Sequence, residues 1–142
     1  MNKEILVMET GPELDTLVAE RVMGHPMPAF ISEDALDLYL AGSPIHYDSW
    51  TCVCRFDEGD VPKWIPDPYS TDIQAAWPVW LAITKNDPYR WAIYPNSKKS
   101  DEVIIEHYSY YGGQECGEGE LSIVGLAPEA ICKAALIVFV GK

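Results

Sequence analysis

Hydrophobic residues first recur at helical spacing near the start of the chain. The apolar positions, at intervals of one to four residues, are Leu14, Leu17, Val18 and Val22. Thr10 and Glu13 have the spacing of a capping box, and Gly24 ends the pattern. These signals predict a helix over 10–24 with one buried stripe and with Asp15 on its exposed face.

Three further helices are predicted downstream. One has a single apolar stripe made by Ile73, Trp77, Trp80, Leu81 and Thr84. Its predicted N-cap is Ser70 or Thr71, and the interior Pro78 should kink it. The second begins at Ala127-Pro128-Glu129 and is apolar over most of its circumference through Val140, so we expect it to be enclosed. A weaker pattern after Ser32 predicts a short helix.

Strand-like runs rich in β-branched and aromatic residues alternate between two faces. They cover 51–56, 90–94, 103–111 and 121–125. Polar and glycine-containing segments separate the last three, which is typical of an antiparallel meander. Residues 61–69 contain prolines that lack a donor for a sheet ladder, so we predict a structured connector there and no central strand.

This order of elements predicts a single α+β domain over 1–142. Its antiparallel sheet has about four strands and is covered by helices in a helix-sheet-helix sandwich. A length of 142 residues suits one hydrophobic core, and no internal repeat interrupts the chain.

Charge narrows the classes of partner. The chain has 22 acidic and 10 basic residues, for a net charge of −12. This sign disfavours an extended nucleic acid or an anionic membrane as a partner. No apolar run reaches the roughly 20 residues that span a bilayer, and no signal-peptide core follows Met1, so we expect a soluble cytosolic protein. The four cysteines are then predicted to be free thiols.

Three stretches carry a family resemblance. They are residues 9–24 (ETGPELDTLVAERVMG), 68–77 (PYSTDIQAAW) and 127–136 (APEAICKAAL). In this order they resemble small phage and prophage proteins that carry the phage ABA sandwich domain. The resemblance implies a helix-sheet-helix sandwich that is encoded by a phage or prophage and works in the host cytoplasm. The family is defined by its fold, so the resemblance implies no catalytic residue.

A search for catalytic and metal-binding patterns predicts neither kind of site. No strand-turn-helix nucleophile motif is present, and the three histidines are scattered along the sequence. Cys52 and Cys54 are separated by one residue, unlike the spacing of structural zinc knuckles. The glycine-containing stretch 112–119 lacks the Gly-Lys-Ser/Thr ending of a phosphate-binding loop. We therefore predict no catalytic residue, no metal and no cofactor.

Aromatic residues are concentrated in the middle of the chain. All five tryptophans and seven of the eight tyrosines lie between Tyr47 and Tyr111, together with two of the three arginines. Core packing explains some of them, and an aromatic ligand site edged by cations explains the excess. The predicted ligand-binding residues are Trp50, Arg55, Trp64, Tyr69, Arg90, Trp91, Tyr94, Tyr108 and Tyr110.

Three functions are compatible with these features. The first is a non-enzymatic phage accessory protein that binds a host-derived molecule, such as a nucleotide-derived defence signal. The second is an acidic protein that imitates nucleic acid and antagonises a host factor. The third is an enzyme that acts on a nucleotide and uses His107 or a cysteine. The sequence favours a binder over an enzyme. The apolar C-terminal helix also predicts a homo-oligomer if its own chain leaves it uncovered.

Overall fold

The structure is a computed structural model and describes residues 2–29, 33–42, 45–54, 62–85, 90–107, 110–111, 114–115 and 121–140. The helices are α1 (Asn2–Val7), α2 (Pro12–Leu17), its π-helical continuation η1 (Val18–Val22), α3 (Glu33–Leu40), α4 (Ile73–Thr84) and α5 (Ala127–Val140). The strands are β1 (Ile45–Tyr47), β2 (Trp50–Cys54), β3 (Pro62–Pro66), β4 (Trp91–Pro95), β5 (Glu102–His107), β6 (Tyr110–Tyr111), β7 (Gln114–Glu115) and β8 (Leu121–Leu126).

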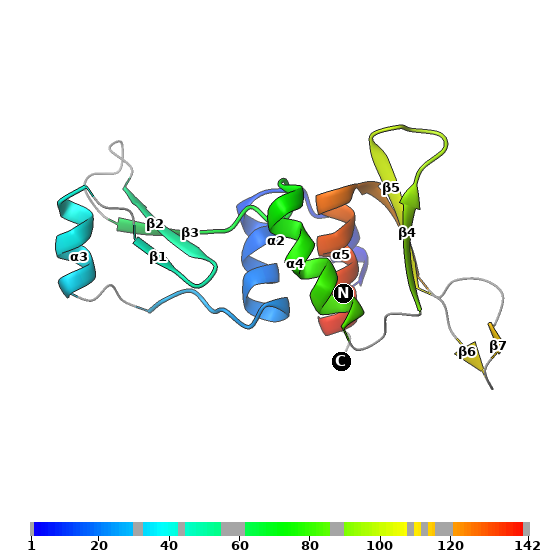
Figure 1. Cartoon of the computed structure of the whole chain (residues 1–142), viewed down its shortest axis with the longest axis horizontal. Helices are drawn as coiled ribbons and strands as arrows, with labels where there is room; N and C mark the ends of the chain where they lie inside the picture. Colours follow the sequence, from blue (N-terminus) through cyan, green and yellow to red (C-terminus); the bar gives the residue numbers. More distant parts are fainter. Residues whose placement is uncertain are drawn as a thin grey trace.

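The strands form two separate three-stranded antiparallel sheets, in the orders β1-β2-β3 and β4-β5-β8, and β6 pairs with β7. Helices α2, α4 and α5 lie between the two three-stranded sheets along the long axis of the molecule (Figure 1). The predicted α+β class and the antiparallel meander are confirmed. The number of strands differs from the single sheet of about four, because β1 and β3 pair with β2 at a distance from the meander.

Helix α5 occupies the centre of the hydrophobic core. Its residues with no exposed surface are Ala130, Ile131, Cys132, Ala134, Ala135 and Leu136. Helices α4, α1 and η1 and strands β5 and β8 all contact it. Its one buried cation, Lys133, donates to the Glu129 carboxylate at 2.6 Å and to the Leu6 carbonyl at 2.9 Å. The prediction of an enclosed C-terminal helix is confirmed, and the enclosing surfaces belong to the same chain.

The predicted capping box at Thr10 is wrong. Helix α2 begins at Pro12, and its N-cap is Gly11, which has a φ of 139° and makes no side-chain capping bond. The Gly11 amide is instead satisfied over a long sequence distance, because it donates to Ser70 Oγ at 2.9 Å. The N-cap amide is therefore bound by Ser70, from a distant part of the sequence, and not by Glu13 as the capping box predicted.

Residues 62–66 form an edge strand, so the predicted connector is wrong over these residues and the prediction of no central strand there is confirmed. Strand β3 pairs with β2 over its whole length, from Trp50 opposite Pro66 to Cys54 opposite Pro62. It lies at the edge of its sheet, where two terminal prolines cost few ladder bonds. The short helix after Ser32 is present as α3.

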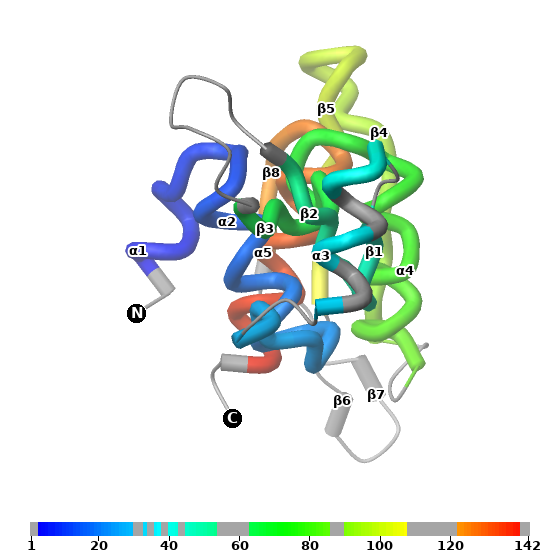
Figure 2. Tube along the Cα trace, turned by 90° about the vertical axis from the view of Figure 1, so that its left-hand side faces the viewer, coloured from blue at the N-terminus to red at the C-terminus, as the bar shows by residue number. Residues whose placement is uncertain are grey.

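Helix α4 buries a different face from the one predicted. Its N-cap is Asp72, whose carboxylate accepts the Gln74 amide at 2.9 Å, and the helix continues through Pro78. The buried residues are Ala76, Val79, Trp80 and Ile83. From the predicted stripe, Ile73, Trp77 and Leu81 are exposed and only Trp80 is buried. Helix α4 lies on the outside of the helical layer (Figure 2). Because the helix has no charged face, the sequence pattern does not show which of its sides is buried.

The β4-β5-β8 sheet has one buried face and one exposed face. Ile105 and Ile123 lie opposite each other in adjacent strands and are buried, 0% and 4% exposed, on the side that meets α5. Val124 and Leu126 of β8 point to the other side and are 54% and 46% exposed. Val103, Ile105 and His107 alternate along β5 and lie on the face that meets α5, in agreement with the two-faced strand predicted over 103–111.

Candidate functional site

The structure divides the predicted aromatic site into two groups. Trp50, Trp64 and Tyr69 belong to the β1-β2-β3 sheet and its connection to α4, whereas Arg90, Trp91 and Tyr94 belong to the region of β4. The helical layer lies between the two groups (Figure 1). The backbone of Tyr110 lies in β6, and Arg55 and Tyr108 lie outside the described residues.

Trp50 and Tyr69 form the joint between the β1-β2-β3 sheet and the helices. Each is only 2% exposed. Trp50 Nε1 donates to the His25 carbonyl at 2.8 Å, and the His25 ring nitrogen Nδ1 lies 2.8 Å from Ser49 Oγ. The side chain of Ser49 also hydrogen-bonds with the Tyr69 hydroxyl. Because these polar atoms satisfy one another, the group holds two parts of the fold together and presents little surface to a ligand.

A buried carboxylate completes this joint. Asp15 is 5% exposed, which corrects its prediction as a surface residue, and its Oδ1 accepts the Ser70 amide at 2.7 Å. Burial raises the pKa of Asp15, and the hydrogen bonds from Ser70 oppose that rise. Burial likewise raises the pKa of Asp67, against the charges of His46 and His25. The Asp15 carboxylate is therefore a structural partner of Ser70.

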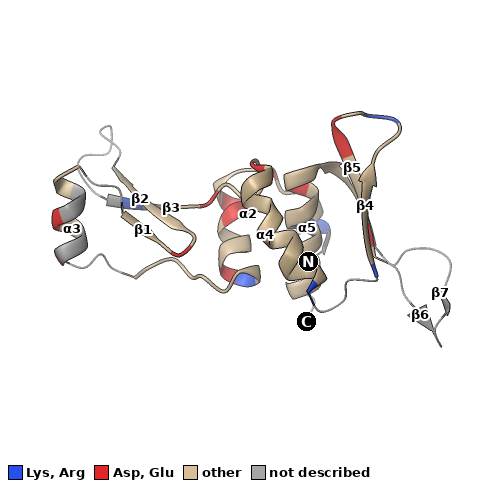
Figure 3. Cartoon of the chain, in the orientation of Figure 1, with Lys and Arg blue, Asp and Glu red and all other residues tan. Residues whose placement is uncertain are grey.

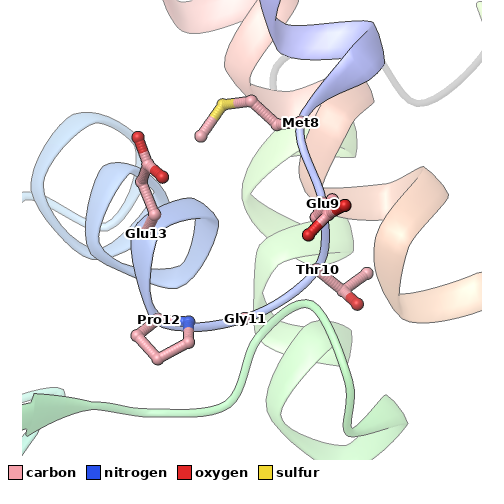
Figure 4. A pocket seen from close by; sticks show the side chains of 6 residues that line it. All are labelled: Met8, Glu9, Thr10, Gly11, Pro12 and Glu13. Atoms are coloured by element: carbon pink, nitrogen blue, oxygen red, sulfur yellow. The ribbon is translucent and has the colours of Figure 1, made fainter.

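A pocket of about 370 Å³ lies next to the joint, at the loop between α1 and α2. Its lining residues are Met8, Glu9, Thr10, Gly11, Pro12 and Glu13. The side chains of Met8 and Glu13 extend from opposite sides of the loop (Figure 4). No lysine or arginine belongs to this lining, and two carboxylates do. The pocket is therefore poorly suited to an anionic ligand such as a nucleotide.

An aromatic cluster at the end of the β4-β5-β8 sheet has a composition better suited to a nucleotide. The Trp91 ring lies against the His107 ring, with centroids 4.6 Å apart and an interplanar angle of 43°. Trp80 of α4 meets Trp91 edge-on at 6.2 Å and 81°. Trp91 and His107 are half-buried, Trp80 is buried, and the half-buried Arg90 directly precedes Trp91.

Trp80 and His107 were missing from the predicted site. Trp91 pairs directly with His107 across two antiparallel strands, so the strand register brings their rings together. The pairing of the run at 90–94 with the run at 103–111 would have indicated this contact. Trp80 comes from a helix, and no local pattern connects it to the sheet.

Tyr94 lies on the opposite face of the same sheet. It is 37% exposed, and its hydroxyl donates to the Glu106 carboxylate on the neighbouring strand. This hydrogen bond raises the pKa of Tyr94. Tyr94 and Trp91 therefore face different sides of β4 and do not line one surface.

The comparison with protein families decides the classification. The sequence pattern of the phage ABA sandwich domain matches residues 16–136. The chain belongs to the phage ABA sandwich family. The match runs from α2 through both three-stranded sheets and α4 to the middle of α5. Membership in the phage ABA sandwich family makes this a phage-type protein with the expected combination of helices and antiparallel sheets.

Other comparisons and searches add no ligand to this picture. No curated protein and no solved structure matches this phage ABA sandwich chain significantly. In the part of the chain that the structure describes, no group of three or more histidine, cysteine or acidic residues could hold a metal ion. No helix within the same described ranges has the length and apolar character to cross a membrane. Of the four cysteines predicted to form no disulfide, Cys52 and Cys132 are buried and form none. Cys116 lies outside the described residues.

Proposed function

We propose that this phage-type protein is a non-enzymatic accessory protein that binds a host-derived small molecule in the host cytoplasm. The observation that carries the proposal is the contact of Trp91 with His107 and Trp80 at the end of the β4-β5-β8 sheet. Half-buried aromatic rings form a surface that can stack on a nucleobase, and Arg90, next to Trp91 in the sequence, is the residue that we assign to bind a phosphate. A nucleotide-derived defence signal has both groups.

The overall charge does not oppose a ligand of this size. A net charge of −12 repels a long polyanion, whose many phosphates meet the whole acidic surface. A single nucleotide is recognised over a few ångströms, where Arg90 and the ring faces dominate and the more distant carboxylates are screened by salt. The proposed site therefore combines an acidic exterior with one local anion contact.

Isothermal titration of the full chain against cyclic and ADP-ribose-derived nucleotides tests this function. We expect one ligand to bind at about micromolar Kd or tighter, and Trp91→Ala to weaken it by about tenfold or more, because stacking on the indole is lost. Arg90→Ala should also weaken binding. Tyr47→Ala is the matched control, since Tyr47 is 57% exposed on β1, away from the cluster. No heat from any ligand in the set would contradict the proposal.

The same samples distinguish a binder from an enzyme. We expect the bound nucleotide to be recovered unchanged after incubation, with identical mass before and after. A product that forms with the wild type and not with His107→Ala would support the enzymatic alternative instead.

The acidic antagonist is the second candidate, and the distribution of charge supports it. Acidic residues lie on α2, on α3 and along the β4-β5 sheet region, so they are spread over the length of the molecule (Figure 3). Such a protein would recover a basic host protein from a lysate, and that capture would weaken as salt is added. Binding of a small molecule by the Trp91 cluster requires no basic protein partner.

A further inference from the structure

Helix α4 carries an exposed apolar stripe. Ile73, Trp77 and Leu81 are spaced four residues apart, so they lie on one face of the helix. Their exposed fractions are 48%, 50% and 51%. Gln74 and Pro78 are also exposed and widen the patch along the next row. A half-exposed tryptophan between two half-exposed aliphatic residues is a typical centre of a protein interface.

The stripe is free of charge in a strongly charged chain. Residues 73–84 contain no acidic or basic side chain, whereas the whole chain has 22 acidic and 10 basic residues. The ribbon of α4 accordingly shows neither acidic nor basic colour along its length (Figure 3). Two copies that each carry a net charge of −12 repel each other over most of their surface. An uncharged apolar helix is the kind of surface on which such copies can meet.

The spacing of the stripe is self-complementary. Ile73 and Leu81 are each four residues from Trp77, so an antiparallel pair of α4 helices places the two tryptophans at the centre and each Ile73 beside the other copy's Leu81. A twofold interface requires this property, because the same patch must fit itself.

Charges at the two ends of α4 match the same arrangement. The exposed Asp72 caps the N-terminal end, and the exposed Lys85 follows the C-terminal end at the next position of the stripe, four residues after Leu81. The two residues are separated by about 20 Å along the helix. In an antiparallel pair centred on Trp77, Lys85 lies about 4.5 Å along the axis beyond the other copy's Asp72, so the two opposite charges share one end of the pair. A parallel pair would instead place like charges together.

We propose that α4 is the self-association surface of this protein and that two copies pair through it in antiparallel orientation, with the twofold axis near Trp77. This inference is independent of the proposed ligand. The stripe is smaller than the roughly 800 Å² per partner of a standard interface, so we expect a dimer with a Kd of about micromolar.

Sedimentation velocity of the full chain from about 1 to about 100 µM tests the proposal. We expect the wild type to convert from monomer to dimer over this range, and Trp77→Glu to raise the dimer Kd by about 100-fold or more. Val124→Glu is the matched control, because it adds the same charge to an apolar residue of similar exposure on the sheet, at 54%. It should dimerise like the wild type. Circular dichroism checks that each variant is folded, and Leu81→Glu provides a second disruption of the same stripe.

The pairing of the helix ends has its own test. Lys85→Glu should weaken the dimer by about threefold to tenfold, because it replaces a cation with an acid at the end of the pair where the other copy has Asp72. The double variant Asp72→Asn with Lys85→Glu should restore much of the loss, since asparagine keeps the oxygen that caps the helix and removes the repelling charge. A wild type that stays monomeric up to about 100 µM, or a Trp77→Glu variant that dimerises normally, would overturn the proposal. Absence of rescue in the double variant would overturn the antiparallel orientation.

Discussion

Asp15 is an acidic residue that the fold buries. It lies one residue after the buried Leu14, and its carboxylate holds the amide of Ser70, from the segment that leads into α4. The Ser70 hydroxyl accepts a hydrogen bond from the amide of Gly11, the N-cap residue of α2. Ser70 is therefore hydrogen-bonded both to the N-cap residue and to Asp15 within the helix. A short polar network thus replaces the local helix cap and fixes the position of the neighbouring connection.

Removal of the Asp15 carboxylate should be costly. We expect Asp15→Ala to lower the free energy of unfolding by about 1–3 kcal/mol, because the Ser70 amide is left buried without an acceptor. Asp15→Asn keeps an oxygen at this position and should cost less. Urea denaturation of the three proteins at neutral pH measures both effects. Equal stability of the wild type and Asp15→Ala would contradict the role of this hydrogen bond.

The pH dependence of Asp15 has a definite sign. Burial raises its pKa in the folded protein above the usual 3.8, so the folded state holds the proton more tightly than the unfolded state. The contribution of Asp15 to stability therefore falls as pH rises from the unfolded-state pKa through the folded-state pKa. Relative to Asp15→Asn, we expect the wild type to lose stability as pH rises above about 4. Asp67 has a shift of the same direction, and its charge also raises the pKa of Asp15, so the difference between the two proteins reports Asp15 together with its coupling to Asp67.

At the scale of elements, the β1-β2-β3 sheet depends on a narrow connection to the rest of the fold. It stands apart from the helical layer, which it reaches through the connections at both ends and a contact between β3 and α2 (Figure 1). Trp50 is the largest fully buried side chain of the protein's described residues, and it lies at this connection. The indole therefore acts as the anchor of the sheet.

Substitution of this anchor should release the sheet without unfolding the core. Trp50→Ala removes the packed indole and the hydrogen bond to His25, a loss of about 3–5 kcal/mol for a buried tryptophan. We expect hydrogen exchange to become fast in 45–54 and 62–66 and to stay slow in α5 and β5, because their contacts are independent of Trp50. Tyr47→Phe, at an exposed position of β1, is the control. Loss of protection in α5 to the same extent would show that the two parts unfold as one unit.

The sequence predicts elements with strong local signals and misses those that distant contacts determine. Alternation identified the β4, β5 and β8 strands, and the apolar circumference of α5 identified the central helix. The Gly11 cap could not be predicted, because its partner, Ser70, lies 59 residues away. The buried face of α4 could not be predicted either, since a helix without charges has two apolar faces and only tertiary contacts choose between them.

The candidate site was predicted only in composition. Abundant tryptophan and tyrosine pointed to an aromatic surface, but the fold places β2, which begins with Trp50, and β4, which begins with Trp91, on opposite sides of the helical layer. Trp91 and Tyr94 both lie in the strand predicted over 90–94, and alternation along that strand was enough to place them on opposite faces. The contact of Trp91 with Trp80 required the packing of α4 near the sheet.

At the scale of the whole molecule, the net charge of −12 predicts that the proposed self-association strengthens as salt is added. Two copies joined through α4 repel each other through their acidic surfaces, and added salt screens that repulsion. We expect the dimer Kd to fall severalfold as NaCl rises from about 20 to about 300 mM, where the screening length shortens from about 20 to about 6 Å. The contact between Asp72 and Lys85 weakens over the same range, but an exposed pair contributes little. Sedimentation equilibrium at several salt concentrations measures the trend, with Trp77→Glu as the control that should stay monomeric throughout. A dimer that weakens with salt would instead mean that opposite charges hold it together, which contradicts an interface built on the uncharged stripe of α4.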